Sequence, residues 1–128
     1  MAHQLYNQSL TVMIETDDEA IFDLLPNDGA GYSILRQLWA KIYGSMTISF
    51  SMLPQFRNEL DQLLDELKEQ LTPKMVRQHK VTATDPAIAG PIVDGLLMRD
   101  PLYSKLKQMV ALCDDSLDSK QSIECIGD

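Results

Sequence analysis

The amino-acid sequence predicts an α+β fold, in which a small antiparallel sheet of two to four strands is covered by about four helices. Residues 46–52 alternate between apolar and polar side chains, which is the period of a strand with one buried face. Residues 53–71 instead place apolar side chains at helical spacing. The length of 128 residues suits a single compact, helix-rich domain with one core.

The expected helix over residues 53–71 has one apolar face, and its other side is rich in acids and amides. The apolar face consists of Leu53, Phe56, Leu60, Leu63, Leu64, Leu67 and Leu71. Pro54 is tolerated in the first turn, where backbone N–H groups have no partner in the helix. We expect Thr72-Pro73 to end this helix. The leucines span too few heptads for a zipper, so they predict a core.

The N-terminal third contains a second strand and a short helix. Residues 1–9 are polar and without periodicity, so we expect a mobile segment. Residues 10–15 alternate and predict a strand, which would pair within the sheet. Thr16 and Glu19 have the spacing of a capping box, which predicts the start of a helix over residues 17–25.

A helix with aromatic residues is expected over residues 32–43, after a connector rich in turn residues. It holds Trp39, the only tryptophan of the chain. A strand follows directly, so the helix must fold back over the sheet, and Trp39 packs most simply in the core. The alternative is a contact with a partner, since tryptophan is enriched at the energetic centres of interfaces.

The C-terminal third predicts further helices and a closing strand. Asp85 and Asp100 are each followed by proline and an apolar run, which is typical of an N-cap with proline at the first helical position. The first of these helices is weak, because glycine and proline interrupt it. The second is expected over residues 102–113. Residues 121–126 alternate weakly and predict a strand beside one of the two earlier strands.

The two cysteines and the hydropathy bear on the compartment. Cys113 and Cys125 have no histidine or cysteine at metal-ligand spacing, so free, buried thiols are expected, with a disulfide as the alternative. No apolar run approaches the ~20 residues that span a bilayer, and the first residues do not resemble a signal peptide. We therefore expect a cytoplasmic protein that does not bind membranes.

Charge is the most informative bulk property. The formal net charge is −8, and the sequence pI is about 4.6. Residues 1–71 and 108–128 are acidic, whereas residues 72–107 hold 6 basic and 3 acidic side chains. An acidic surface repels nucleic acid and anionic headgroups. We therefore expect no direct binding of nucleic acid, and we expect a basic protein as the partner.

The sequence contains no pattern that predicts a catalytic centre, a metal site or a cofactor site. His3 and His79 are the only histidines, and neither lies in a setting typical of a general base. The acids of residues 17–19 favour a helix start more than a metal site. Residues 114–125 lack the glycine and the glutamate of a calcium loop.

These observations favour a non-enzymatic acidic binding protein. We expect it to inhibit a basic or nucleic-acid-processing partner, as immunity proteins, antitoxins and phage-encoded anti-defence proteins do. The alternative is a homodimeric secretion chaperone or adaptor, so the chain is expected to be a monomer or a homodimer. The expected partner-binding residues are Glu59, Asp61, Asp65, Glu66, Glu69 and Trp39.

Overall fold

The structure of the protein, a computed structural model, describes residues 2–25, 31–41 and 44–127. Its strands form one antiparallel sheet of four strands in the order β2-β1-β4-β3. The strands are β1 (Ala2–Tyr6), β2 (Thr11–Glu15), β3 (Ser45–Ile48) and β4 (Ile123–Gly127). The helices are η1 (Thr16–Leu24), α1 (Ser33–Ala40), η2 (Phe50–Met52), α2 (Leu53–Gln78), α3 (Pro86–Leu97) and α4 (Pro101–Asp118), of which η1 and η2 are 3₁₀ helices. The predicted fold class is confirmed.

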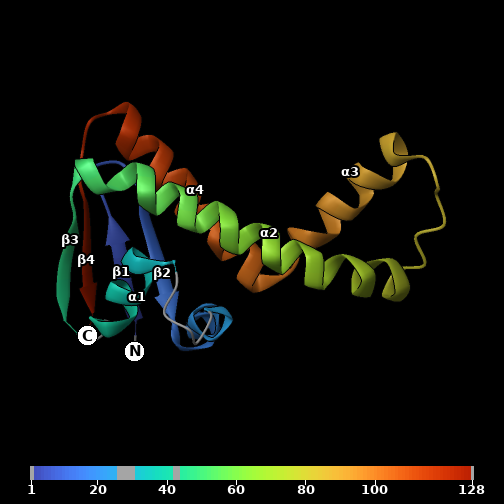
Figure 1. Cartoon of the computed structure of the whole chain (residues 1–128), viewed down its shortest axis with the longest axis horizontal. Helices are drawn as coiled ribbons and strands as arrows, with labels where there is room; N and C mark the ends of the chain where they lie inside the picture. Colours follow the sequence, from blue (N-terminus) through green and yellow to red (C-terminus); the bar gives the residue numbers. More distant parts are fainter. Residues whose placement is uncertain (1, 26–30, 42–43, 128) are drawn as a thin grey trace.

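The sheet has one buried and one exposed face. Leu5 on β1 pairs with Val12 on β2 and with Cys125 on β4, and all three side chains are buried. Their neighbours along each strand point the other way, and Gln4 and Ile126 are exposed. The helices therefore cover a single face, and the core lies between this face and α2 and α4. Figure 1 shows the sheet at one end of the molecule, with these helices along one side of it.

The expectation of a mobile segment over residues 1–9 is wrong for residues 2–6. These residues form β1, which is an inner strand because it pairs with both β2 and β4. Two inward side chains, His3 and Leu5, are buried. So short an alternation, with a histidine as one of its two members, is not recognisable by period alone.

The other predicted strands are present with changed ends. The closing strand is confirmed as β4, and it lies between β1 and β3. The strand predicted over 46–52 stops at Ile48, after which the chain turns through η2 and leaves Phe50 exposed. The helix predicted from Thr16 is a 3₁₀ helix whose capping box begins one residue earlier, between Glu15 and Asp18.

The helix predicted over 53–71 is longer than expected. It continues through Pro73 to Gln78, so the expectation that Thr72-Pro73 would end it is wrong. Beyond the proline, Met75 is buried and belongs to the apolar core cluster, which also contains Val93 and Leu97 of α3. This packing offsets the cost of a proline inside a helix, which is about 3 kcal/mol.

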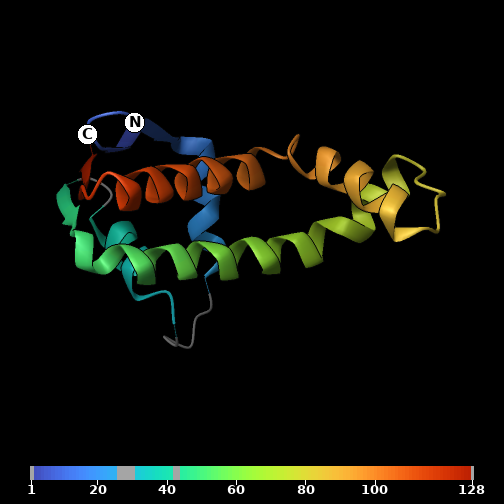
Figure 2. The ribbon, with the colours of Figure 1, turned by 90° about the horizontal axis from the view of Figure 1, so that it is seen from above.

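The remaining helices agree with the sequence in part. Asp85 and Asp100 cap α3 and α4, because their carboxylates accept hydrogen bonds from the backbone N–H groups of Ala87 and Tyr103. The helix expected over 32–43 is described as Ser33–Ala40, and residues 42–43 lie outside the described residues. Figure 2 shows α2 and α4 side by side.

The molecule is elongated because a helical hairpin extends beyond the sheet (Figure 1). We call residues 72–99 the arm. It consists of the end of α2, the connection after it and α3, which runs back along α2 (Figure 2). The arm holds four of the chain's 11 lysine and arginine residues and only two of its 19 acidic residues. It therefore differs in charge from the acidic remainder of the molecule.

Candidate partner interface

The polar side of α2 presents four carboxylates to solvent. Asp61, Asp65, Glu66 and Glu69 are all exposed. The leucine face of the same helix is buried, so the helix is fixed with these acids pointing outward. We call these four residues the acidic face. Five acids were predicted to be exposed on this helix, and four of them are.

Glu59 is not part of this surface, so its prediction as an exposed partner-binding residue is wrong. Its side chain is 4% exposed. One carboxylate oxygen accepts a hydrogen bond from the backbone N–H of Leu35 at 3.0 Å, and the other accepts from Ile34 at 3.2 Å and from the Gln55 amide at 3.0 Å. Glu59 therefore caps the N-terminus of α1, where free N–H groups and the helix dipole favour a carboxylate.

The sequence contained a signal for this burial. Glu59 follows Phe56 by three residues and precedes Leu63 by four, which places it on the apolar side of the helix. The expectation that Glu59 is exposed rested on its charge alone. The sequence does not reveal the position of α1, because the backbone donors of Ile34 and Leu35 lie more than 20 residues from Glu59 along the chain.

Asp61 shares a cation with an acid of another helix. The Arg57 guanidinium forms ion pairs with Asp61 on α2 and, at 2.7 Å, with Asp114 on α4. The hydrogen bonds to Asp114 and Asp61 raise the pKa of Arg57 above its ordinary value. Asp114 was not predicted as a partner-binding residue. Together the three side chains leave a single negative charge where the two helices meet.

Glu66 is held by a hydrogen bond from α1. The Tyr32 hydroxyl donates to Glu66 Oε1 at 2.9 Å. Burial, followed by this hydrogen bond to a carboxylate, raises the pKa of Tyr32 to about 12. This hydrogen bond fixes the orientation of the Glu66 carboxylate.

Asp65 and Glu69 are the carboxylates with the fewest contacts inside the molecule. Within the described residues neither carboxylate forms a hydrogen bond or an ion pair. They border an open surface hollow of about 520 Å³, together with Lys68, Thr72 and Pro73. Lys68 is engaged by Asp94 of α3, with 3.5 Å between the ammonium and the carboxylate oxygen. The two carboxylates therefore offer the least compensated negative charge of the acidic face.

Trp39 is partly packed against the core and partly exposed, so both alternatives stated for it, packing in the core and contact with a partner, remain. Its ring stacks on Phe22 of η1, with 4.8 Å between ring centroids and an interplanar angle of 24°. The side chain is nevertheless 41% exposed, so it closes the edge of the core and also meets solvent. Among the described residues, no recorded contact joins Trp39 to the acidic face.

The cysteines are free and buried, as predicted. Burial raises the pKa of both thiols, Cys113 and Cys125, to about 12. Cys113 Sγ lies 3.5 Å from the Leu53 carbonyl oxygen, and Cys125 is on the inner face of β4. Neither thiol is a nucleophile at neutral pH, because the thiolate is the reactive form.

Another hollow lies at the end of the sheet. It has a volume of about 490 Å³ and is lined by residues of the β1–β2 and α4–β4 connections and of the adjoining strand ends: Tyr6, Asn7, Gln8, Lys120, Gln121, Ser122 and Glu124. The Gln8 backbone N–H donates to Gln121 Oε1 at 2.9 Å and joins the two connections, while the Asn7 amide nitrogen donates to Asp115 at 2.8 Å and to Ser116 at 2.9 Å on α4. The polar groups here bind one another, which indicates a structural role.

Comparison of the chain with models of protein families, with curated proteins and with solved structures found no match. In the part of the chain that the structure describes, no helix is both long and apolar enough to cross a membrane. The same residues include no group of three or more histidine, cysteine, aspartate or glutamate side chains placed to hold a metal ion.

Proposed function

We propose that this protein is an acidic binding protein that inhibits a basic partner protein by occupying its surface, with no catalytic step of its own. The observation that supports the proposal is the acidic face, where Asp65 and Glu69 are exposed and have no recorded cation partner among the described residues. A row of carboxylates on one rigid helix attracts a basic surface and orients it during encounter. Nucleases and other proteins that act on nucleic acid have such basic surfaces, so they are the partner class proposed.

The net charge supports the same proposal. At −8 the chain would be repelled by nucleic acid, whereas a basic protein would be attracted over about one Debye length, ~8 Å at physiological salt. The acidic face is held from behind by buried leucines and, at Glu66, by the hydroxyl of Tyr32. The helix and the Glu66 side chain therefore need little ordering on binding, which lowers the entropic cost of association.

The test is a double charge reversal at the least compensated positions, Asp65→Lys with Glu69→Lys. The chain is used as bait in a lysate of its native host, and the captured protein is purified so that association rates can be measured at low and high salt. We expect the reversal to slow association at least tenfold at low salt while the melting temperature stays nearly unchanged. The matched control is Asp23→Lys with Asp118→Lys, which makes the same charge change at two exposed positions outside the acidic face.

The mode of action is tested by titration. Inhibition of the captured partner that saturates near one chain per target site supports stoichiometric binding. Conversion of the target or of a small molecule by substoichiometric protein would contradict the proposal. An equal loss of association rate in both double variants would also contradict it, because the effect would then come from net charge and not from the acidic face.

A second candidate is a homodimeric chaperone or adaptor. The observation that favours it is the apolar outer surface of α3, where Ile88 and Ile92 are 56% and 46% exposed. A chaperone of this kind would self-associate and would present a further apolar surface to a client. Its oligomeric state is therefore the first property to determine.

A further inference from the structure

Helix α3 is apolar on nearly all sides, yet it packs against the molecule on one side only. Of the residues between Pro86 and Leu97, Asp94 is the only one with a charge. Val93, Leu96 and Leu97 are buried toward α2. A helix that is apolar all round is normally buried all round. The outer side of α3 is thus a surface that the other described residues do not cover.

The exposed residues on that side form a continuous stripe. Ile88, Pro91, Ile92 and Gly95 are all exposed and follow the spacing i, i+3, i+4, i+7. We call these four residues the α3 stripe. A Cβ added at Gly95 would meet nothing within 4 Å, so the helix surface is bare at this position, which we call the Gly95 notch. The stripe therefore has large side chains at one end and no side chain at the other.

This arrangement is complementary to itself when two copies run antiparallel. A two-fold axis between Pro91 and Ile92 places Ile88 of each copy over the Gly95 notch of the other, and Pro91 against Ile92. Such isologous contacts are the commonest way in which identical chains associate. Small residues opposite large ones also let two helices approach closely.

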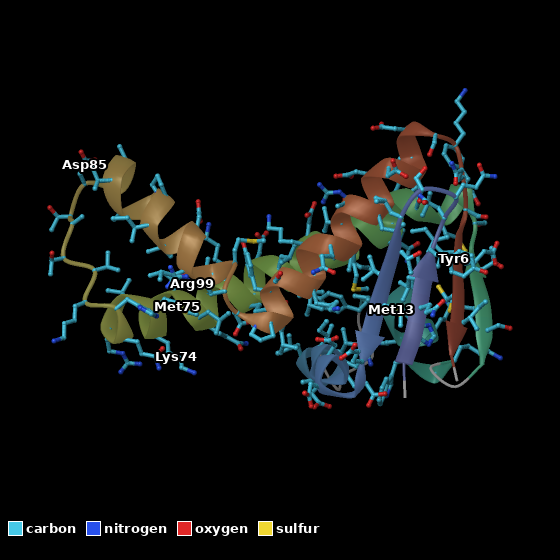
Figure 3. The ribbon with its side chains drawn as sticks, turned by 180° about the vertical axis from the view of Figure 1, so that it is seen from behind. Tyr6, Met13, Lys74, Met75, Asp85 and Arg99 are labelled. Carbon is cyan, nitrogen blue, oxygen red and sulfur yellow. The ribbon has the colours of Figure 1, made fainter. Side chains whose placement is uncertain are left out.

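Charges at the two ends of the stripe match the same arrangement. Asp85 is the N-cap directly before α3, and Arg99 follows its C-cap Met98, so the two charges flank α3 at opposite ends, and both are exposed. Figure 3 shows Asp85 at the outer tip of the arm and Arg99 at its base. In the antiparallel pair, Asp85 of each copy comes beside Arg99 of the other. Lys74 lies on the opposite side of α2 from α3 (Figure 3), which keeps its charge away from this contact.

We propose that the α3 stripe is the contact between two copies of this chain, which pair antiparallel through their arms with Asp85 of each copy beside Arg99 of the other. The dimer covers Ile88 and Ile92 and holds the two acidic bodies apart at opposite ends of the paired arms. The acidic faces on both copies stay accessible. The pairing is independent of the partner that the acidic face binds.

The test begins with sedimentation of the full chain over a wide concentration series. We expect an apparent mass near 29 kDa, which is twice the 14.4 kDa of one chain. Ile92→Glu should return the chain to the mass of a monomer, because it buries a charge in the contact. Ile126→Glu is the matched control, since Ile126 is 45% exposed against 46% for Ile92 but lies on the outer face of the sheet. A wild-type chain that remains a monomer throughout would overturn the proposal.

Gly95→Gln separates a lost contact from a lost fold. Glutamine is a better helix former than glycine and has open space at this position, so α3 itself should gain stability. It fills the notch that receives Ile88, so we expect the dissociation constant of the dimer to rise at least tenfold, or ~1.4 kcal/mol. Unchanged self-association in this variant would overturn the pairing.

The antiparallel geometry has its own test. Arg99→Glu places two carboxylates together at each end and should raise the dissociation constant. Adding Asp85→Ser should reverse much of that loss, because the repulsion ends while serine retains the N-cap of α3. If Asp85→Ser gives no recovery in the Arg99→Glu background, the two residues do not meet across the contact and the antiparallel pairing is wrong.

Discussion

At the scale of single residues, Glu59 shows how a charged side chain can serve the fold. Its carboxylate accepts hydrogen bonds from two backbone N–H groups at the start of α1, and these N–H groups have no partner within the helix. The residue at the N-cap of α1 is Tyr32, which has a left-handed conformation (φ 56°) and forms no side-chain cap. Glu59 therefore supplies from α2 the cap that α1 lacks in its own sequence.

Glu59→Ala should destabilise the protein by about 2 to 4 kcal/mol. The substitution leaves two buried N–H groups without an acceptor, and each such group costs roughly 1 to 3 kcal/mol. Urea denaturation measures the change. Asp65→Ala, on the exposed side of the same helix, is the control and should alter the free energy of unfolding by less than about 0.5 kcal/mol. Equal effects of the two substitutions would show that the cap contributes nothing.

The other predicted site residues illustrate what spacing can and cannot reveal. Asp61, Asp65, Glu66 and Glu69 are exposed as the helical period indicates. The period does not reveal which of them is compensated, because the compensating groups come from other elements. Arg57 is one helical turn from Asp61, but Asp114 belongs to α4 and Tyr32 lies just before α1. The helical period identifies the exposed face, but only the tertiary fold shows which of its carboxylates are compensated.

At the scale of elements, α2 belongs to both the sheet-bound body and the arm. The helix passes from the body into the arm near Pro73, whose nitrogen cannot donate to the carbonyl of Glu69. The hydroxyl of Thr72 donates to the Lys68 carbonyl at 2.7 Å, a local bond of a kind that often bends helices. The sequence predicted an end here for sound local reasons. Packing of Met75 against α3, which is remote in sequence, overrides them.

Pro73→Ala should stabilise the protein by about 1 to 2 kcal/mol. The change restores one backbone hydrogen bond and removes the ring clash, and the greater freedom of the unfolded chain offsets part of the gain. The shift is measured by urea denaturation. Pro54→Ala is the matched control, because Pro54 occupies the first turn of the same helix, where no backbone donor is missed. A loss of stability in Pro73→Ala would mean that the arm depends on a bend at the proline.

The sequence missed β1 and predicted α3 only as a weak helix. β1 has only five residues, two of them inward and buried, and α3 combines two glycines with an internal proline. Neither has a clear apolar period. In both cases neighbours hold the segment in place: β2 and β4 on either side of β1, and α2 beneath α3.

At the scale of the whole molecule, the sheet and the long helices share one core. Cys125 lies on the inner face of β4, and Cys113 lies on α4 against the start of α2. Both side chains are fully buried within the same apolar cluster. Since both thiols belong to this shared core, we expect them to reach water together when the molecule unfolds. The connection between α2 and α3, at the tip of the arm, is the part of the molecule that lies farthest from the sheet (Figure 1).

This shared burial predicts a steep loss of stability in alkali. Burial raises the pKa of each thiol from 9.0 to about 12, so the unfolded chain releases protons that the folded chain retains. The stabilising contribution is full below pH 9.0 and falls as the pH rises toward about 12. Each thiol contributes a slope of about 1.4 kcal/mol per pH unit within this window. Urea denaturation at a series of pH values measures this slope.

The double variant Cys113→Ala with Cys125→Ala is the control. It should be less stable at neutral pH because of the cavities, yet should lose less stability per pH unit above pH 9.0. Parallel pH profiles for the two proteins would show that the thiols meet water before the molecule unfolds, and that the sheet and α4 do not form one cooperative unit.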